Sequence, residues 1–368
     1  MNKLFSALFV TSALAVSSST VLANEQGLLN ALQPSQDSFF GNLRMGYINS
    51  DNQDEGQMEG SAFGGKFGYL SGDWNGINAG ATVYATQELT DNENGDFFSS
   101  ESKSYSILGE AFVSAAIGAT SVKAGRFEFD SPHGDTDDIR MVPNTFSGVL
   151  LTDKSLSDTT FYVAHLSQWS GIDAENPEEF NDLNKSSGVS LVGSLYEGVD
   201  DLSLQAWYYH GANFADWIYA DAIYQINNLS LGVQYGHQSD STDEDSSTDG
   251  DAYGLMASYS LDKFTISTAY NTVSGTVTNG FGGGPFFTSA DDHTIDGVED
   301  QKALTIGAEY TGFDGLTFGV VSVDFDKGND ETDIYLNYEL EESLSIEFVY
   351  TDMNDDGSMW RGILNYSL

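Results

Sequence analysis

Residues 125–143, GRFEFDSPHGDTDDIRMVP, bring together side chains that can act on a charged solute. The segment has neither the period of a helix nor that of a strand, and Pro132 and Pro143 restrict φ near its two ends. Carboxylates and a guanidinium that face water attract or repel ions through their charge. The residues that could do this here are Asp130, Asp135, Asp137, Asp138 and Arg140.

Catalysis and metal binding have weaker support in this sequence. The histidines, at positions 133, 165, 210, 237 and 293, are scattered without metal-ligand spacing. His165 and Ser167 could pair as base and nucleophile, but no carboxylate or amide that would orient the base is evident. Residues 352–357 match the first half of an EF-hand loop, yet position twelve is Ile363 instead of Glu. We therefore expect no catalytic residue, no dedicated metal site and no cofactor, with at most weak Ca²⁺ or Mg²⁺ association with acidic loops such as 240–251.

The N-terminus has the features of a secretory signal peptide. Lys3 precedes an apolar stretch over residues 4–16, and Val21–Ala23 fits a small-x-small cleavage signal. We interpret residues 1–23 as a signal peptide and residues 24–368 as one exported domain. No later run of apolar residues is long enough for a transmembrane helix.

Composition narrows the class of protein further. The chain has 56 acidic against 13 basic residues, a net charge of −43, and this excludes nucleic acid as a partner. It also has 19 Tyr, 23 Phe and 5 Trp, which is far too aromatic for a disordered polymer. Since there is no cysteine, stability must come from burial or from a membrane instead of disulfides.

Alternation with a period of two is the dominant pattern in the sequence. In residues 39–47 the odd positions are mostly apolar and the even positions include Asn42 and Arg44. In residues 103–116 the same reading puts Tyr105 and Ile107 on the apolar face. The segments with such a pattern lie near 38–50, 60–71, 77–88, 103–116, 119–128, 145–153, 159–169, 187–196, 202–211, 215–226, 229–238, 252–261, 264–274, 303–311, 316–325, 331–340, 343–352 and 358–368.

The connections between these segments alternate between short turns and longer acidic loops. Segments of this length suit tilted strands that cross a bilayer, and short turns on one side with long loops on the other are typical of an outer-membrane barrel. We predict an all-β fold, a transmembrane antiparallel β-barrel of eighteen strands, with sixteen as the alternative. A soluble β-sandwich would not need an aromatic-flanked apolar band on every strand. Residues 125–143 follow the fifth strand, and we expect this third loop to fold into the lumen and narrow it.

The same region resembles a known family. Residues 123–132, KAGRFEFDSP, followed by residues 137–149, DDIRMVPNTFSGV, are similar to the third-loop region of the OprD-type porins. That pattern has a strand ending in G-x-Q/F, a Pro-containing loop with D-D-x-R-x-x-P, and a strand opening with F-x-G. The resemblance implies an eighteen-stranded channel for small nutrients that often bear a carboxylate, or for basic amino acids. It also implies a basic ladder on one wall and an acidic patch opposite.

Alternation also assigns charged residues to the inner face, because a charge that faces lipid at the midplane costs about 2–4 kcal/mol. The predicted basic wall contains Arg44, Lys66 and Arg361, extended by Lys123 or Arg126, whose phase is ambiguous around Gly125. The predicted opposing acidic wall contains Glu110, Asp221, Glu309, Asp333 and Glu347. Strand ends in contact with water or headgroups are the alternative location for these residues.

These observations favour a porin in the outer membrane of a Gram-negative cell, through which small hydrophilic solutes and ions diffuse passively. Acidic loops at the mouth should favour cations or small charged nutrients. The alternative is a structural or adhesive barrel that does not conduct. Expected partners are outer-membrane lipid, lipopolysaccharide and small solutes, and the sequence leaves a homotrimer open.

Overall fold

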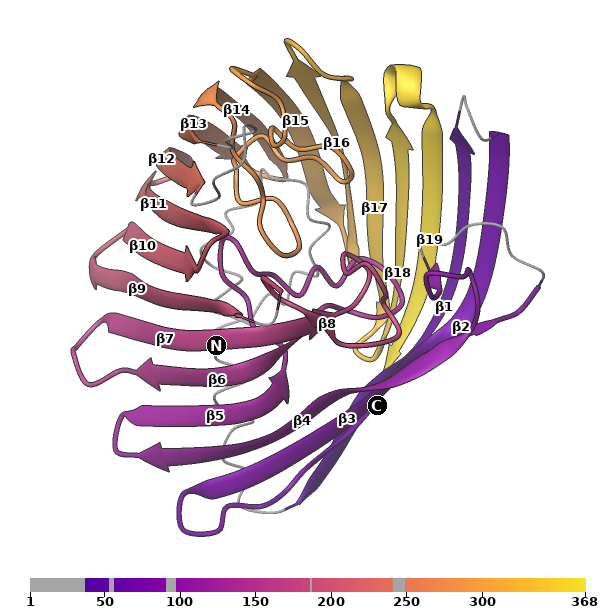
Figure 1. The fold of residues 1–368 in the computed structure, drawn as a ribbon. Helices are drawn as coiled ribbons and strands as arrows, with labels where there is room; N and C mark the ends of the chain where they lie inside the picture. The colour runs from indigo at the N-terminus through magenta and orange to yellow at the C-terminus, as the bar shows by residue number, and fades with distance from the viewer. Residues whose placement is uncertain (1–36, 53–55, 91–96, 186, 241–248) are drawn as a thin grey trace.

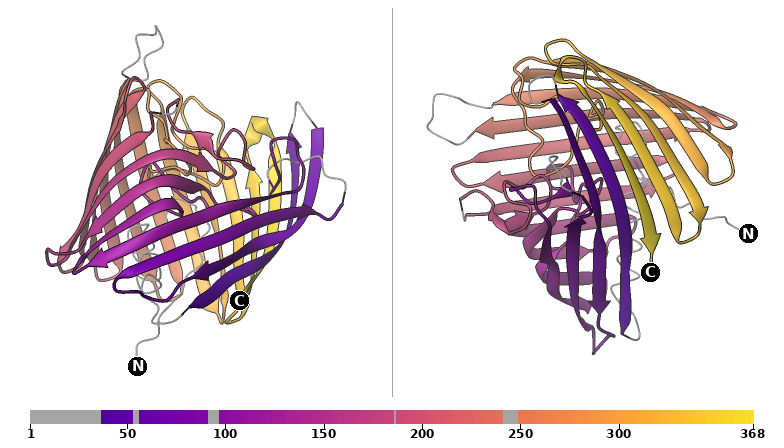
Figure 2. Two further views of the ribbon diagram at one scale, coloured as in Figure 1. Left: turned by 60° about the horizontal axis from the view of Figure 1, so that its bottom comes forward. Right: turned by 90° about the vertical axis from the view of Figure 1, so that its right-hand side faces the viewer.

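The computed structural model describes residues 37–52, 56–90, 97–185, 187–240 and 249–368, and the expected signal peptide lies outside them. One antiparallel sheet closes into a barrel, because β1 (Ser38–Asn52) pairs with both β2 (Gly56–Leu70) and β19 (Ser358–Ser367). Figure 1 looks into this barrel and Figure 2 shows it from two further directions. The other strands are β3 (Ile77–Glu88), β4 (Tyr105–Ile117), β5 (Thr120–Phe127), β6 (Thr145–Asp153), β7 (Thr159–Ser170), β8 (Asn181–Asp182), β9 (Val189–Val199), β10 (Leu202–Gly211), β11 (Ala215–Ile226), β12 (Leu229–Asp240), β13 (Gly250–Leu261), β14 (Phe264–Gly275), β15 (Lys302–Phe313), β16 (Leu316–Phe325), β17 (Glu331–Glu341) and β18 (Leu344–Asp352).

Eighteen of these strands form the wall. The remaining one, β8, has two residues and pairs only with Gln168 and Trp169 of β7, while β7 itself continues to β9. The predicted eighteen-stranded antiparallel barrel is therefore confirmed, and the sixteen-stranded alternative is wrong. In the described part of the chain, no helix is long and apolar enough to cross a membrane.

The wall carries apolar side chains outwards, and inwards it carries polar and small side chains together with an aromatic cluster on β7 to β11. On β13 and β15, Leu255 is 60% exposed and Ile306 is 58% exposed, whereas Thr305 beside Ile306 is fully buried. Aromatic pairs lie near strand ends, including Phe39 with Tyr69 and Phe264 with Tyr310. A lipid-facing apolar band with aromatic side chains at its edges is the arrangement that a bilayer stabilises.

β4 departs from strict alternation. Its register to β3 shifts at Gly109, which forms a β-bulge. The bulge turns Tyr105 and Ile107 inwards, where both pack against a buried cluster, and Leu108 takes the outer position. The prediction that Tyr105 and Ile107 belong to the apolar outer face is therefore wrong.

Two long connections fold into the barrel and pack against the inner face of its wall, where the buried core lies. We call residues 128–144, between β5 and β6, loop 3, and residues 276–301, between β14 and β15, loop 7. Phe129 of loop 3 packs into an aromatic cluster on β7 to β11, and Phe286 of loop 7 packs with apolar residues of β11 to β18. Figure 1 shows loop 7 in orange inside the ring of strands.

The two loops are bonded to each other. The Phe281 N–H of loop 7 donates to the His133 carbonyl of loop 3 at 3.1 Å, and the Asp135 N–H donates back to the Phe281 carbonyl at 3.0 Å. This bridge joins segments that are almost 150 residues apart in sequence. The sequence indicated the entry of loop 3 into the lumen, but it gave no indication of loop 7.

Replacing Ile306 with Arg should lower the free energy of unfolding by about 2–4 kcal/mol, because the charge would enter hydrocarbon near the middle of β15. Denaturant titration of the barrel in phospholipid vesicles measures the change. Replacing Ile306 with Leu is the control and should cost less than about 1.5 kcal/mol. Equal stability of the Arg and Leu variants would contradict the assignment of this face to lipid.

Candidate functional site

Loop 3 is shaped by one capping carboxylate. Asp130 Oδ1 accepts hydrogen bonds from the N–H of Thr136 at 3.0 Å and from its hydroxyl at 2.7 Å. Between them Ser131 and Gly134 form a bridge that reverses the chain. Burial raises the pKa of Asp130, and the two bonds from Thr136 act against this shift. Asp130 thus stabilises the conformation of loop 3 by accepting these two hydrogen bonds.

His133 fixes loop 3 to the barrel wall and was not predicted to do so. Its ring lies between those of Tyr209, Trp217 and Tyr219 of the wall and Phe286 of loop 7, with centroid distances of 5.4 to 6.3 Å. Nδ1 lies 2.8 Å from a loop 7 carbonyl oxygen. Burial lowers the pKa of His133 to about 4, so the ring is neutral at physiological pH and packs as an aromatic residue.

Asp135 and Asp137 lie in a crowded acidic part of loop 3. The Asp137 N–H donates to Asp135 Oδ1 at 2.7 Å, and Asp173 of the connection after β7 lies close to both. Burial, followed by repulsion from the neighbouring carboxylates, raises the pKa of Asp135 and of Asp137. Loop 3 therefore carries less negative charge at neutral pH than its four aspartates suggest.

Arg44 joins the wall to loop 3. From the inner face of β1 it binds both carboxylate oxygens of Asp138, at 2.6 and 2.7 Å, and donates to the Arg140 carbonyl at 2.6 Å. The Arg140 side chain is 8% exposed and lies 4.0 Å from Asp292 of loop 7. Asp138 and Arg140, which were predicted as constriction residues, are thus part of the contacts that position the two loops.

Lys66 on β2 makes a similar contact at the start of loop 3. Its Nζ lies 2.7 Å from Glu128 Oε1. The hydroxyl of Tyr84 lies 2.6 Å from Glu128 and 3.0 Å from Glu110, and its single proton can go to only one of them at a time. Burial alone would raise the pKa of Glu128, but the charge of Lys66 holds it below its ordinary value.

Arg361 makes the corresponding contact with loop 7. Its guanidinium binds both carboxylate oxygens of Asp291, at 2.9 and 3.0 Å, and Glu347 of β18 lies 3.6 Å away. The Arg361 side chain is 1% exposed and the Asp291 side chain is fully buried. A bidentate geometry of this kind is the strong form of an arginine–carboxylate contact.

The phase ambiguity around Gly125 is resolved by the structure. Lys123 points inwards over the rings of Phe112 and Phe127 at 4.7 and 5.6 Å. Arg126 lies on the other face of β5, where its guanidinium stacks on Phe180 at 4.1 Å. The inclusion of Arg126 in the basic inner wall was therefore wrong.

The predicted acidic wall does not stand opposite the basic one. Glu347 lies beside Arg361. Glu110 contacts the Tyr84 hydroxyl, which also contacts Glu128, the partner of Lys66. Asp333 on β17 accepts the backbone N–H of Asp291 at 3.2 Å, next to the same arginine. For these three carboxylates the prediction of facing walls of opposite sign is wrong, because charges of both signs are interleaved on β1, β2, β4 and β17 to β19.

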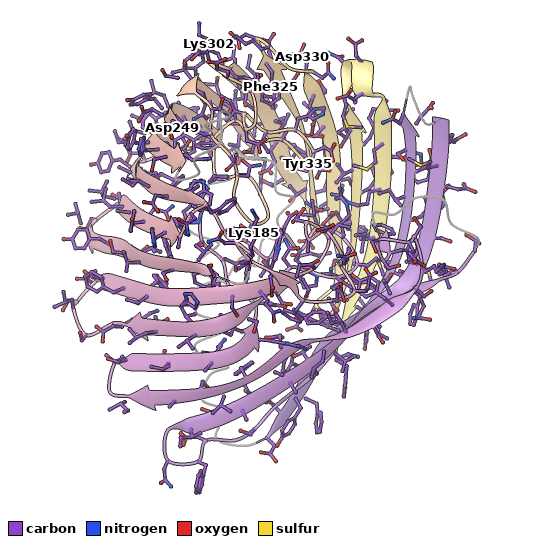
Figure 3. The ribbon with its side chains drawn as sticks, viewed as in Figure 1. Lys185, Asp249, Lys302, Phe325, Asp330 and Tyr335 are labelled. Carbon is purple, nitrogen blue, oxygen red and sulfur yellow. The ribbon has the colours of Figure 1, made fainter. Side chains whose placement is uncertain are left out.

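The other two predicted acidic residues are held by tyrosines. Tyr335, labelled in Figure 3, lies on the inner side of β17 and donates from its hydroxyl to Glu309 on β15 at 2.9 Å. Tyr219 donates to Asp221 on β11, also at 2.9 Å. Alternation predicted the face of both carboxylates but not their partners.

A cavity of about 180 Å³ lies on the inner wall, on the short-turn side of loop 3. Lys123 of β5, Glu128 and Asp130 of loop 3 and Leu150 of β6 are among its lining residues. The cavity therefore presents charges of both signs beside an apolar surface.

The structure does not bring together the residues of the catalytic and the metal-binding hypotheses. His165 Nδ1 lies 3.0 Å from Ser190 Oγ, while Ser167 donates to the Ser147 carbonyl, so His165 and Ser167 do not form a pair. In the EF-hand-like segment, Asp356 faces a histidine at 3.3 Å. Among the described residues, no group of three His, Cys, Asp or Glu side chains is placed to hold a metal ion. Most of the acidic segment 240–251 lies outside those residues.

An eighteen-stranded barrel with charged loops folded across its lumen is the architecture of an outer-membrane porin. The sequence matches the model of outer membrane porins of the OprD family over residues 78–294, which is more than half of the chain. The chain therefore belongs to the OprD family, as the loop 3 motif indicated. It is an outer-membrane barrel and a channel for small solutes, and its relatives are porins rather than enzymes.

Solved structures share the fold over almost their whole length. Pseudomonas aeruginosa OccK8 (OprE) is 19% identical with a TM-score of 0.79, covering 90% of this chain and 98% of its own. Pseudomonas aeruginosa OpdK with vanillate is 17% identical with a TM-score of 0.79 and the same coverage. Acinetobacter baumannii OccAB4 is 17% identical with a TM-score of 0.77, covering 91% and 99%. No curated protein matches the sequence.

Replacing Arg361 with Met should lower the free energy of unfolding by about 3–5 kcal/mol, because Asp291 would remain buried without its partner. The double variant Arg361→Met with Asp291→Leu should recover most of this loss. Denaturant titration in vesicles measures both. Replacing Arg126 with Met is the matched control, since that arginine lies outside the lumen. If both Arg→Met changes lower the free energy of unfolding by the same amount, loss of the Arg361–Asp291 ion pair is not the cause of the destabilisation.

Proposed function

We propose that this porin passes small hydrophilic solutes by diffusion and favours cations. The observation that carries the proposal is the pairing of Arg44, Lys66 and Arg361, each of which has a carboxylate within 3 Å. Because these cations are already neutralised, the remaining charge of the inner face comes from its more numerous carboxylates. A pore with excess negative charge concentrates cations and repels anions, and salt weakens the effect.

Carboxylate solutes are the second candidate class. The support is the likeness to OpdK, which was solved with vanillate, a carboxylate. In this chain such a solute would have to displace a loop carboxylate from Arg44, Lys66 or Arg361. We therefore rank carboxylates below cations and neutral solutes as cargo.

The first test is single-channel recording in planar bilayers. A conducting porin gives steady ohmic steps, and the reversal potential in a KCl gradient should have the sign of cation preference. Replacing residues 130–142 with a short Gly-Ser link should raise the conductance, because loop 3 would no longer occupy the lumen. Silence of the folded protein would favour the structural or adhesive barrel, and an unchanged conductance would contradict the role of loop 3.

Cation preference should increase with pH. Burial and neighbouring carboxylates raise the pKa of Asp135 to about 7, so this carboxyl gains negative charge as the pH rises from about 5 to about 8. The K⁺ over Cl⁻ permeability ratio should rise by roughly two- to threefold over this range. Replacing Asp135 with Asn should reduce the rise, whereas replacing Asp182, on β8, should not. A ratio that is flat with pH in the unmodified porin would contradict the proposal.

The proposal also includes what the outside of the barrel and its acidic loops bind. We infer that lipid and lipopolysaccharide contact the exposed apolar band, that the assembly is a homotrimer, and that acidic loops associate weakly with Ca²⁺ or Mg²⁺. The exposed apolar outer face supports a contact with lipid or with other subunits equally. Native mass spectrometry in detergent, with and without added divalent ions, distinguishes a trimer from a monomer and counts bound ions and lipids.

A further inference from the structure

Residues 291–293, which we call the tip of loop 7, form one of several attachments of this loop to the wall; another is the pair of bonds from Thr288 to Asn271 of β14. The N–H groups of Asp292 and His293 both donate to the Glu331 carboxylate of β17, at 2.9 and 2.7 Å. The preceding residue, Asp291, donates its N–H to Asp333 of the same strand at 3.2 Å. The tip therefore presents backbone donors to two acidic side chains of one strand.

The His293 ring adds a contact to a third element. Nδ1 lies 3.2 Å from Glu331 Oε2, and Nε2 lies 3.3 Å from Asp356 Oδ2. Asp356 is the last residue of η2 (Asn354–Asp356), the turn between β18 and β19. Both ring nitrogens thus face carboxylate oxygens. A neutral imidazole has a single N–H, so only the protonated ring can donate to both carboxylates at once.

The charges around His293 favour its protonated form. The carboxylates that face it are Glu331 from β17, Asp356 from η2 and Asp292 from loop 7 itself. Arg140 of loop 3 is a cation from another element and lies 4.0 Å from Asp292. The contact with Glu331 raises the pKa of His293, burial opposes the shift, and the other two carboxylates add to it. Asp291, which precedes Asp292, is bonded both to Asp333 and to Arg361.

We propose that His293 is a positioning residue that controls how firmly loop 7 is held across the lumen, and therefore the width of the pore. The protonated ring ties loop 7 to β17 and to η2 through two carboxylates. The neutral ring keeps one of these contacts at most. The proposal rests on the proposed function only in its consequence for solute passage, because the attachment of loop 7 can be measured separately.

The direction of the pH effect follows from the two states of the loop. When loop 7 is released, His293 has its ordinary pKa of 6.5, and when the loop is bound the pKa is higher. The stabilisation is therefore fully present below the ordinary value and is lost as the pH rises through the higher one. Loop 7 should be held more firmly at about pH 5.5 than at about pH 8.5, with a narrower pore at the lower pH.

Hydrogen exchange of the loop tip tests the attachment directly. The amides of Asp292 and His293 are bonded to Glu331, so a peptide covering residues 288–297 reports their opening. After correction for the chemical exchange rate, opening in the folded porin should be roughly three- to tenfold more frequent at the higher pH. The variant His293→Gln should open at both pH values as the unmodified porin does at the higher one.

Two further variants serve as controls. His165→Gln changes a histidine on β7 that is bonded to Ser190 and should retain the full pH dependence. Asp356→Asn removes one of the two carboxylates and should reduce the dependence, which also provides a test if His293→Gln fails to fold. The same pH dependence in His293→Gln as in the unmodified porin would overturn the proposal.

Single-channel conductance of the same proteins separates this inference from the proposed function. Conductance that rises with pH in the unmodified porin but not in His293→Gln supports both. Exchange that depends on His293 in a barrel that does not conduct refutes the channel and leaves the role of His293 intact. Conduction together with exchange that is indifferent to His293 refutes the positioning role and leaves the channel intact.

Discussion

The pairing of β1 with β19 is the constraint from which the interior of this molecule follows. Backbone groups in hydrocarbon must be bonded within the sheet, so a membrane sheet has to close. With eighteen strands, closure creates a lumen that the side chains of the wall cannot fill by themselves. Loop 3 and loop 7 enter this space and carry carboxylates with them. Buried carboxylates need partners, and the basic residues of the inner wall provide them.

Loop 3 and loop 7 contact the wall through two kinds of interaction, on different groups of strands. On β7 to β11 the contact is aromatic, with His133 of loop 3 enclosed by rings of the wall and of loop 7. From β17 round to β2 the ionic contacts of Arg361, Arg44 and Lys66 add to the apolar packing of Met141 and Val142 of loop 3. Since ionic contacts respond to pH and salt and aromatic packing does so much less, a change of solution conditions acts mainly on one side of the lumen. The basic residues that would be read from sequence as a ladder for solutes are occupied by the protein's own loops.

Local periodicity was sufficient to predict the wall, because each strand exposes alternate residues to lipid and to the lumen. It predicted the strands, their number and the inner position of Arg44, Lys66 and Arg361. It could not predict the partner of Arg361, since Asp291 is 70 residues away in a loop without periodicity. It failed where the backbone itself departs from the pleat, at the bulge of Gly109 and at Gly125, which has φ +129°. The inward folding of loop 7 depends on packing between distant segments, which a single sequence does not display.

The positions of Arg44 and Arg361 bear on how the molecule is assembled. The first lies on β1 and the second on β19, the opening and closing strands of the chain, which meet at the seam of the barrel. Asp291 of loop 7 binds the guanidinium of Arg361, so this contact requires β19 to be in place between β18 and β1. Closing the wall and fixing loop 7 are therefore coupled. A barrel halted with its seam open would still be able to form its aromatic side, while its ionic side would stay unfinished.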